Sequence, residues 1–433
     1  MRYIPSNLSI LTAMQIYQAL RYGAWALVSV MLSKSFLMQS EIGRYEQVMM
    51  LGTFFSFFWI NSIFITLLAN YNTKSQNSRD FFFSVFCIFT LFNTLFAIVL
   101  YVGQHQVCQL LIGKYELHYF ELMLCFFYLN NFSYFIEHIF LLHQKSLQLL
   151  LYAAFNLIIQ VSFVAIAVFY FQSLQSLFIG LICFAAFKIP IVLYLVYPFC
   201  RPFNIQTTKE VLIICMPLVV SFFITGSNEF IDKFMVSHYF DKAMYAQYTY
   251  GARELVISTV LSQALTAVCL TAASYDFDAG LSMLKSKSIA YVRILFPIAI
   301  VGMFATFYFF PVVFNTNFSM SWAIMNTYFL LLIPRFLFPQ VVLNVLGKNN
   351  FILIASVFEL AFNLLFTFLL FPLLGFIGIA LGPLMGLILG KILLIYFCSF
   401  YEVPLTKFVF IKEYVLWSIV LVLSYLVSLF IFL

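Results

Sequence analysis

Long apolar stretches separated by short polar segments run through the whole sequence. Each stretch is roughly 20 residues or longer, the length that a helix needs to cross the ~30 Å hydrocarbon core of a bilayer. Their spacing predicts about thirteen membrane-spanning helices, without the strand-type alternation of a membrane β-barrel. The expected spans are 8–33, 45–70, 81–103, 119–142, 149–171, 177–199, 211–236, 246–273, 290–313, 323–345, 351–372, 378–399 and 414–433.

The composition agrees with this pattern and narrows the class of protein. Of the 433 residues, 64% are hydrophobic and 9% are charged, and the mean hydropathy is +1.03. Soluble domains are about 45–50% apolar and about 25% charged. We therefore expect an all-α polytopic membrane protein. The net charge of +6 then reflects loop topology and not nucleic-acid binding. The eight cysteines form no Cys-x-x-Cys pair, so neither a metal site nor a disulfide framework is predicted. No cofactor is expected.

The basic residues of the short connections indicate how the chain is oriented. Cytoplasmic loops of membrane proteins carry more Lys and Arg than the opposite loops. We therefore expect a multi-pass protein with a cytoplasmic N-terminus. On this assignment the inner connections hold Arg2, Lys74, Arg79, Lys145, Arg201, Lys209, Lys285, Lys287, Arg293, Lys348, Lys407 and Lys412, and the outer ones hold Lys34, Arg44, Lys114 and Lys242.

An internal repeat is visible at a fixed separation. Tyr45 and Tyr248 are 203 positions apart (248 − 45), and so are Lys188 and Lys391 (391 − 188). Both pairs occupy matching places in spans two and eight and in spans six and twelve. This predicts two six-helix lobes in parallel orientation, an arrangement in which transporters bind substrate at the repeat interface. The expected domains are an N-terminal lobe at 1–205, a C-terminal lobe at 206–400 and an additional helix at 401–433.

Four basic residues fall near the middle of predicted spans: Arg21, Lys188, Arg335 and Lys391. On insertion scales each such charge costs roughly 2.5–3.5 kcal/mol, and four together cost on the order of 10 kcal/mol. We therefore expect them to face a wet cavity, a partner or an anionic ligand, with paired structural charges as the alternative. Glu359 is the acidic residue expected at comparable depth, and it is a candidate for ion coupling.

A polar stripe supports an inward orientation of the first of these cations. Gln15, Gln18 and Arg21 recur every three residues, and Tyr22 follows directly. This spacing places a hydrogen-bonding face on one side of the helix. Gln18 is therefore included among the expected substrate-binding residues.

A second charged group lies toward the outer ends of spans seven and eight. Glu229 and Lys233 are four residues apart, a favourable pair on a helix. Asp232 and Arg253 are expected at similar depth, and Glu254 follows them. Two interpretations remain open: a solvated ion-pair cluster that stiffens a hairpin, or a gate or ion-coupling site.

Two further patterns are more typical of helix packing than of chemistry. On span four, Asn130, Tyr134, Glu137 and His138 form a polar face, for which interfacial hydrogen bonding and a proton relay are the alternatives. On span twelve, glycines recur every four residues, which favours close approach of another helix. These glycines are Gly378, Gly382, Gly386 and Gly390.

Once these motifs are placed in order, the chain resembles a known family. The motifs are the segment 32–45, the run Asn228-Glu-Phe-Ile-Asp-Lys followed by Ala246-Gln-Tyr-Thr-Tyr, and Gly347-Lys-Asn-Asn leading to Gly375-Phe-Ile-Gly-Ile-Ala. Together they resemble the polysaccharide flippases of the multidrug/oligosaccharidyl-lipid/polysaccharide exporter superfamily. The resemblance implies a MATE-like fold of two six-helix lobes in a V that alternate between inward-open and outward-open states.

The resemblance also implies a cargo and a setting. The cargo would be a prenyl-diphosphate-linked oligosaccharide, moved from the inner to the outer leaflet of a bacterial inner membrane for polysaccharide synthesis such as that of O-antigen in lipopolysaccharide. Polysaccharide polymerase machinery would be a partner, with a proton or a sodium ion as the coupling ion. The four central cations would then hold the diphosphate or acidic sugars, because they suit an anion in a wet chamber.

Two other functions remain open from the sequence. A multidrug exporter of the same superfamily would carry cationic compounds and would need acidic residues at mid-depth. A membrane glycan polymerase or ligase would need a sizeable outer loop with catalytic residues, whereas the connections here are short. The sequence contains no P-loop, no His-Glu-x-x-His motif and no nucleophile elbow, so no enzymatic activity is expected.

Overall fold

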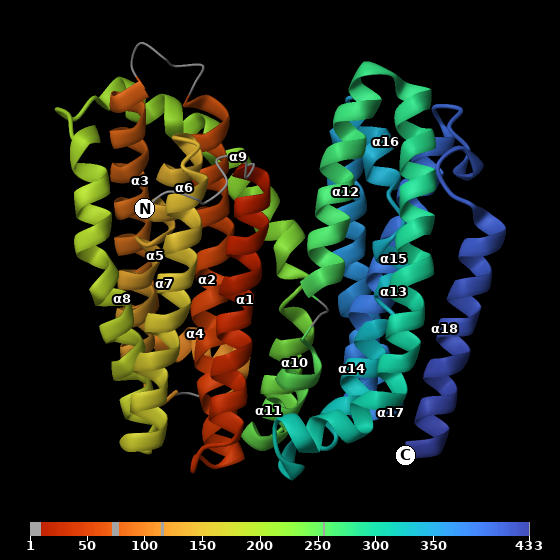
Figure 1. The fold of residues 1–433 in the computed structure, drawn as a ribbon, viewed down its shortest axis with the longest axis horizontal. Coiled ribbons are helices and arrows are strands. Elements are labelled where there is room, and N and C mark those ends of the chain that lie inside the picture. Colours follow the sequence, from red (N-terminus) through yellow and green to blue (C-terminus); the bar gives the residue numbers. More distant parts are fainter. Residues whose placement is uncertain (1–9, 72–77, 114–116, 254–255, 433) are drawn as a thin grey trace, which may run out of the picture. The chain divides into compact units, whose positions relative to one another are not determined.

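The computed structural model describes residues 10–71, 78–113, 117–253 and 256–432, and every regular element within these ranges is a helix (Figure 1). Contacts group the chain into two units. Unit 1 comprises Met1–Gly226 with Asp241–Ala243, and unit 2 comprises Ser227–Phe240 with Met244–Leu433. The predicted all-α polytopic architecture is therefore confirmed.

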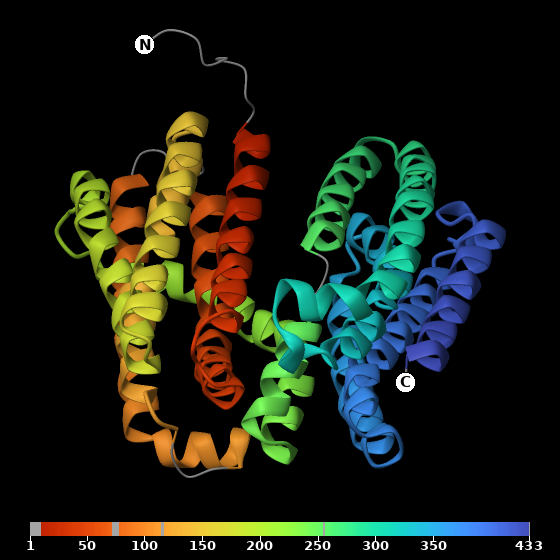
Figure 2. The ribbon, with the colours of Figure 1, turned by 60° about the horizontal axis from the view of Figure 1, so that its bottom comes forward.

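Unit 1 is built from long helices that run alongside one another and a short helix, α4, that crosses them at one end (Figure 2). Its elements are α1 (Ile10–Ser33), α2 (Gln39–Asn70), α3 (Ser78–Val102), α4 (Gln104–Ile112), α5 (Phe120–Asn131), α6 (Tyr134–Leu142), α7 (Ser146–Ala165), the π-helical turn η2 (Ile166–Tyr170), α8 (Leu174–Val196), η3 (Tyr197–Phe199) and α9 (Ile205–Ser227).

Unit 2 is a second helical bundle, and its final helix, α18, lies on its flank beside α13 (Figures 1 and 2). Its elements are α10 (Ile231–Tyr239), α11 (Lys242–Gly251), α12 (Val256–Tyr275), α13 (Phe277–Val313), η4 (Thr316–Phe318), α14 (Ser321–Phe329), α15 (Leu332–Arg335), α16 (Pro339–Val345), α17 (Asn349–Ser399), η5 (Leu405–Lys407) and α18 (Ile411–Phe432).

Within the described residues, nine helical segments are long and apolar enough to cross a membrane. The predicted spans 351–372 and 378–399 form one of these, α17, which bends sharply at Gly375, where φ is +54°. The chain is a multi-pass membrane protein. The domain boundary predicted at 205/206 is based on the sequence repeat, and it stays a prediction. The contacts group α9 with unit 1 and α18 with unit 2.

Four predicted spans are broken into separate helices. Span four divides into α5 and α6, span seven into α9 and α10, span ten into α14, α15 and α16, and span eight into α11 and α12. Pro334 and Pro339 explain the third break, because proline removes a backbone donor and clashes with the preceding turn. At the first break, Ser133 Oγ donates to Asn130 O at 2.6 Å, a local bond that competes with the helix.

Aromatic side chains form much of the core of unit 1. The Trp59 ring stacks on Phe96 with centroids 5.8 Å apart, and it lies 5.1 Å from Phe89. Phe64 packs edge-on against Phe135 at 4.9 Å. Offset and edge-to-face pairs of this kind contribute roughly 0.5–1.5 kcal/mol beyond burial. They join α2 to α3 and α6, so the abundant Phe residues are core residues as well as lipid-facing ones.

The glycine stripe of span twelve joins the two arms of α17. A Cβ at Gly382 would collide with Thr367 Oγ1, and one at Gly390 would lie 2.9 Å from Glu359 Oε2. The glycine with the higher residue number contacts the residue with the lower number, which is the pattern of an antiparallel helical hairpin. The predicted close helix packing is confirmed, and the stripe also fixes where the Glu359 carboxylate lies.

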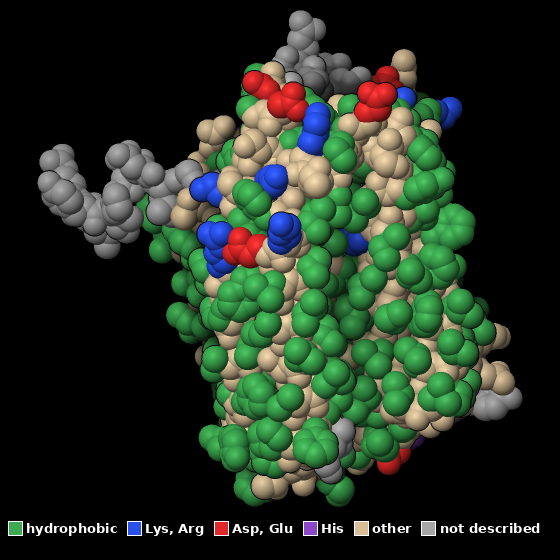
Figure 3. Space-filling view, turned by 90° about the vertical axis from the view of Figure 1, so that its right-hand side faces the viewer, with side chains coloured by type: hydrophobic (Ala, Val, Ile, Leu, Met, Phe, Trp, Pro, Cys, Tyr) green, Lys and Arg blue, Asp and Glu red, His purple; other side chains and the backbone are tan. Residues whose placement is uncertain are grey.

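The outer surface of unit 2 separates apolar from charged regions. Figure 3 shows the face that carries α18, on which hydrophobic side chains cover most of the height and charged side chains gather toward one end. Among the charged side chains of unit 2, Arg293 forms a bidentate pair with Glu413, at 2.5 and 2.8 Å, and Lys407 Nζ lies 3.5 Å from Asp278. This distribution is typical of a bundle with a lipid-facing flank and a polar rim.

We expect Gly382→Ala to destabilise the protein by about 1–3 kcal/mol, because the new methyl group overpacks the hairpin at Thr367. Gly23→Ala is the matched control: nothing lies within 4 Å of a Cβ at Gly23, and alanine favours a helix by about 1 kcal/mol over glycine. Thermal unfolding in detergent should show a lower Tm for the first variant and an unchanged or higher Tm for the second. Equal shifts in the two variants would contradict the packing argument.

Candidate functional site

The first group of predicted residues meets inside unit 1, around Arg21 on α1. Its Nη1 lies 3.4 Å from Glu137 Oε2 on α6, with the arginine side chain 27% exposed and the glutamate 4% exposed. The guanidinium carbon is 5.7–5.8 Å from the centres of the Tyr17, Tyr22 and Tyr134 rings. The charge of Arg21 is therefore held by one carboxylate and by aromatic faces.

Lys188 on α8 belongs to the same cluster, although it is only 3% exposed. Its Nζ donates to Asn130 Oδ1 at 2.6 Å and to Ser133 Oγ at 3.3 Å, and it lies 3.9 Å from the Phe184 ring centre. Glu137 and Arg21 are within electrostatic range of it. In the structure Lys188 is therefore held by neutral oxygens at the break between α5 and α6.

Neighbouring residues hold this break in shape. Asn131 Nδ2 donates to Asn93 Oδ1 at 3.0 Å, and Asn93 Nδ2 donates to Tyr128 O at 2.9 Å. Asn93 lies on α3, so α3 fixes the end of α5. This network turns Asn130 and Ser133 toward Lys188, which explains why the helix can end inside the bundle without leaving its polar groups unpaired.

Glu137 is the residue of this cluster whose role the sequence did not reveal. Glu359 was the acidic residue expected at the depth of the cations, yet Glu137 lies beside Arg21. The polar face predicted on span four contained Glu137, and of its two interpretations the structure shows hydrogen bonding. His138 Nδ1 lies 2.7 Å from Tyr134 O in the same helix. Pairing the polar face of span one with that of span four would have revealed the ion pair.

Unit 2 contains a second cluster, around Arg335 on α15 and Lys391 on α17. Arg335 Nη1 donates to Ser258 Oγ at 2.9 Å and to Thr259 Oγ1 at 3.1 Å, both on α12. Lys391 Nζ donates to Gln340 Oε1 at 2.8 Å. Glu359 and Arg335 are within electrostatic range of Lys391. The residues predicted in the C-terminal half are thus brought together within one unit.

The two clusters share a plan. Each contains two cations and one carboxylate, so each has one positive charge in excess. Each also uses an amide oxygen to hold the lysine of the repeat. Gln340 and Glu137 are 203 positions apart (340 − 137), the separation that relates Lys391 to Lys188. The repeat therefore extends to the residues that surround the cations.

Gln18, predicted with Arg21, lies three residues before it on α1 and is half-buried. It makes no side-chain hydrogen bond with the residues that the structure describes. Its role in binding stays a prediction.

The carboxylate of Glu359 also belongs to an amide-rich group formed by α17 and the turn before α10. Asn228 Nδ2 donates to Glu359 Oε1 at 3.4 Å, and Asn363 Nδ2 lies 3.2 Å from Asn228 O and 3.3 Å from its Oδ1. Thr367 Oγ1 donates to Asn363 Oδ1 at 3.2 Å. Carboxylate, amide and carbonyl oxygens of this kind suit a small cation. No metal-type group of three His, Cys, Asp or Glu side chains occurs among the described residues.

The gating group predicted at the outer ends of spans seven and eight is arranged differently from expectation. Glu229 lies exposed in the turn between α9 and α10, so it does not share a continuous helix face with Lys233. The guanidinium of Arg253 lies 4.6 Å from the centre of the Tyr250 ring. Glu254 lies outside the described residues.

Asp232, the fourth member of that group, is buried on α10 with 1% of its surface exposed. The Tyr248 hydroxyl donates to its Oδ2 at 2.7 Å, and the Tyr328 hydroxyl donates to the same oxygen. These hydroxyls come from α11 and α14 and take the place of the basic partner that the sequence suggested. Asp232 therefore joins three helices through hydrogen bonds to a carboxylate, which are stronger than neutral ones.

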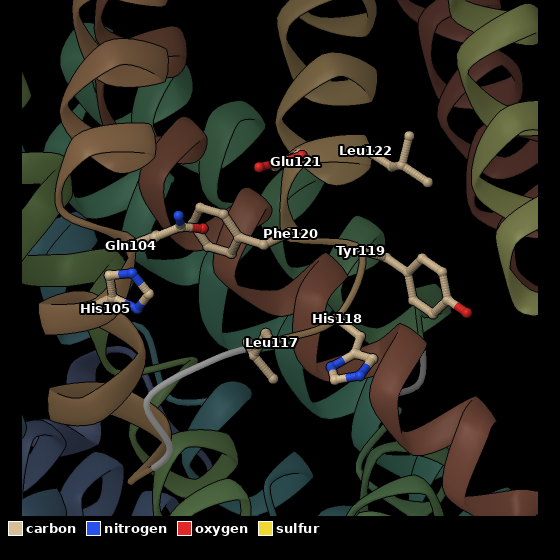
Figure 4. A pocket seen from close by; sticks show the side chains of 8 residues that line it. All are labelled: Gln104, His105, Leu117, His118, Tyr119, Phe120, Glu121 and Leu122. Atoms are coloured by element: carbon tan, nitrogen blue, oxygen red, sulfur yellow. The ribbon is translucent and has the colours of Figure 1, made fainter.

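A hollow of about 380 Å³ lies in unit 1, and none of the predicted residues lines it (Figure 4). Gln104 and His105 line one side of it, and the Tyr119 ring points in another direction (Figure 4). Tyr119 has φ +70° and stacks on Phe178 at 5.6 Å, so it serves the packing of α5 against α8. The candidate functional residues are consequently the two charged clusters inside the units.

The arrangement of helices is shared with solved transporters. A structure described as "Lipid II flippase MurJ, inward closed conformation" aligns with a TM-score of 0.76 at 16% identity, over 96% of this chain and 98% of that one. The fold is that of MurJ and the MATE transporters. An inward-facing multidrug resistance MATE family transporter of the MOP superfamily aligns with a TM-score of 0.64 at 12% identity, over 93% and 97%.

A third structure shares the fold. It is a MOP superfamily transporter from Pyrococcus furiosus, described by a reverse polarity of its binding pocket that suggests a different function. It aligns with a TM-score of 0.59 at 12% identity, over 92% of this chain and 98% of that one. No protein-family profile matches the sequence, and no curated protein matches it.

We expect Glu137→Gln to lower the free energy of unfolding by about 1–3 kcal/mol, less than a fully buried pair would lose because Arg21 is partly exposed. The double variant Arg21→Gln/Glu137→Gln should recover part of this loss, since it leaves no charge unpaired. Chemical unfolding of the four proteins of the cycle measures the coupling. Additive losses would show that the ion pair does not stabilise unit 1.

Proposed function

We propose that the protein is a flippase that moves a prenyl-diphosphate-linked oligosaccharide from the inner to the outer leaflet of a bacterial inner membrane by alternating access. Its N-terminus would be cytoplasmic, and the product would serve polysaccharide synthesis. The observation that carries the proposal is the cationic cluster within the helices of each unit. Arg21 with Lys188, and Arg335 with Lys391, would bind the diphosphate or acidic sugars.

The chemistry of these clusters supports an anionic headgroup. Charged residues inside membrane segments mark substrate or ion pathways, because their insertion is otherwise too costly. Arginine presents several donors in a plane that matches phosphate oxygens, and lysine binds phosphate as a point charge. Amide and hydroxyl partners such as Gln340 and Ser258 hold the cations without neutralising them, so an entering phosphate can replace these bonds. The similarity of fold to a lipid II flippase agrees with a lipid-linked cargo.

The second candidate is a cation-coupled multidrug exporter, because MATE transporters share the fold. Such a protein needs carboxylates facing its cargo. Glu137 lies against Arg21, and Asp232 is enclosed by two tyrosines, which leaves neither carboxylate placed to receive a cationic drug. The description of the Pyrococcus furiosus protein connects pocket polarity with function, so polarity is the property to measure.

We expect Arg335→Gln to weaken binding of geranylgeranyl diphosphate to the purified protein by about 10- to 100-fold, the effect of losing hydrogen bonds from a charged donor. Arg21→Gln should act in the same direction. Lys287→Gln, an exposed lysine near one end of unit 2, is the matched control and should bind as the wild type does. Isothermal titration calorimetry measures all three, and thermal unfolding confirms that each variant is folded.

The same titration separates the two candidate functions. A flippase of this kind should bind the prenyl diphosphate and not the lipophilic cation tetraphenylphosphonium. Tight binding of that cation, together with no binding of the diphosphate, would overturn the flippase proposal and favour the exporter. Flipping of a fluorescent prenyl-diphosphate oligosaccharide in proteoliposomes then tests the transport step itself.

Ion coupling is the second part of the proposal. We assign it to Glu359, whose carboxylate lies among Asn228, Asn363 and Lys391, with Asp232 as a further gating or coupling residue. Glu229, Arg253 and Glu254 would act at the gate. The coupling ion would be a proton or a sodium ion.

We expect Glu359→Gln to remove the response of flipping to an imposed ion gradient, because the neutral side chain can no longer exchange a cation. Binding of the prenyl diphosphate should remain within about threefold, a change of under 1 kcal/mol. Proteoliposomes with either a sodium gradient or a pH gradient identify the ion. Asp278→Asn, at the exposed end of α13, is the control. A full response to both gradients in Glu359→Gln would exclude this carboxylate from coupling.

A further inference from the structure

The break in span ten leaves the backbone carbonyl of Ile333 without its helical partner. In a continuous helix Leu337 N would donate to Ile333 O. Here it donates to Pro334 O at 3.3 Å. An unpaired carbonyl in a membrane-embedded bundle costs several kcal/mol, because no water is present to replace the donor. The structure therefore needs a donor from outside the broken helix.

The additional helix α18 supplies that donor. The hydroxyl of Tyr414, a residue only 8% exposed, donates to Ile333 O. Ile333 precedes Pro334 and Arg335, so the bond acts on the backbone that carries the Arg335 side chain. On its other side Arg335 reaches Ser258 and Thr259 of α12. The segment 333–335 is thus held between α18 and α12.

Several contacts fix α18 along its length, so the Tyr414 hydroxyl has a defined position. They tie the helix to α13 and α14 at both ends and in the middle. They are the bidentate pair of Arg293 with Glu413, the 3.0 Å bond between the Tyr425 and Thr327 hydroxyls, the 3.1 Å bond from Asn326 Nδ2 to Ser428 Oγ, and the stacking of Phe432 on Phe307 at 4.4 Å.

Unit 1 pairs the backbone groups at its broken helix without an additional helix. The break between α5 and α6 is held by Asn93 of α3, through its bonds with Tyr128 O and Asn131. In unit 2 the donor comes from a helix beyond the two sets of six predicted from the repeat. This difference indicates that α18 has a role tied to the broken helix and does more than cover the flank of unit 2.

We propose that Tyr414 is a positioning residue for Arg335, and that α18 is the element that holds the anion-binding arginine of unit 2 in place. The proposal rests on the proposed function only for what Arg335 binds. Removing the Tyr414 hydroxyl frees Ile333 O, and the segment 330–338 then loosens around the arginine. The guanidinium loses its fixed geometry while its charge remains.

The test compares Tyr414→Phe with Tyr425→Phe in the full-length protein. Both variants remove one tyrosine hydroxyl from a hydrogen bond of α18, but the Tyr425 hydroxyl bonds to the side chain of Thr327 on α14 and not to a backbone carbonyl of the break. We expect Tyr414→Phe alone to increase amide hydrogen exchange in the peptide 330–338, by about fivefold for the loss of one hydrogen bond. Tyr414→His retains a donor and should restore part of the protection, which excludes a change due to packing alone.

Binding supplies a second readout, through a cycle with Arg335→Gln. Tyr414→Phe should weaken the affinity for geranylgeranyl diphosphate by about fivefold in the presence of Arg335 and have no further effect in its absence. Unchanged exchange in 330–338, or equal effects of the two tyrosine variants, would overturn the positioning role. If the wild-type protein binds no prenyl diphosphate, the proposed function fails, and the exchange comparison still decides the role of Tyr414.

Discussion

The structure depends on one constraint: a charge or an open carbonyl inside a membrane-embedded bundle must find its partner within the protein. Each unit meets this constraint locally. Arg21 lies against Glu137, and Lys188 is held by Asn130 and Ser133. In unit 2, Gln340 Oε1 accepts a hydrogen bond from Lys391 Nζ. The four central cations are therefore part of the internal bonding of their units, and any ligand that they bind has to replace or share these bonds.

The broken helices follow from the same constraint. A regular helix uses all its backbone groups internally and offers little to a neighbouring cation. Ending α5 at Asn131 lets Asn130 and Ser133 reach Lys188, and ending α15 at Arg335 places the guanidinium beside Ser258. Each break exposes backbone groups that must be paired in turn. Other helices supply the pairing, through Asn93 in one unit and Tyr414 in the other.

The sequence was sufficient for features that depend on composition and period. Hydropathy predicted the spans, and the four-residue glycine period predicted the close packing that joins the arms of α17. The depth of each cation could be predicted by counting residues along its span. The residues that pair with the cations could not be predicted in this way, because Arg21 and Glu137 are 116 positions apart in the sequence. A charge pattern along one helix cannot show which face of which other helix it meets.

The breaks were missed for a related reason. Long apolar runs flank Asn228 and Glu229, and 330–338 is apolar except for Arg335, so a hydropathy profile reports an unbroken span where the backbone turns. Asp232 illustrates the consequence: a span from 211 to 236 placed it at the depth of Arg253, whereas on the separate helix α10 it accepts hydrogen bonds from Tyr248 and Tyr328. Predicted pairs near a break are therefore less secure than pairs within a regular helix.

The nature of the partners also bears on how a ligand could be bound and released. A carboxylate that pairs with an arginine competes with a phosphate for the same donors. A phosphate displaces an amide or a hydroxyl at a lower cost in free energy, because these groups carry no charge. Arg21 with Glu137 is of the first kind, and Lys391 with Gln340 is of the second. Equivalent positions of the repeat, 137 and 340, thus carry a charged and a neutral partner. The repeat relates the two clusters in position, but it does not preserve the charge of the partner at this place.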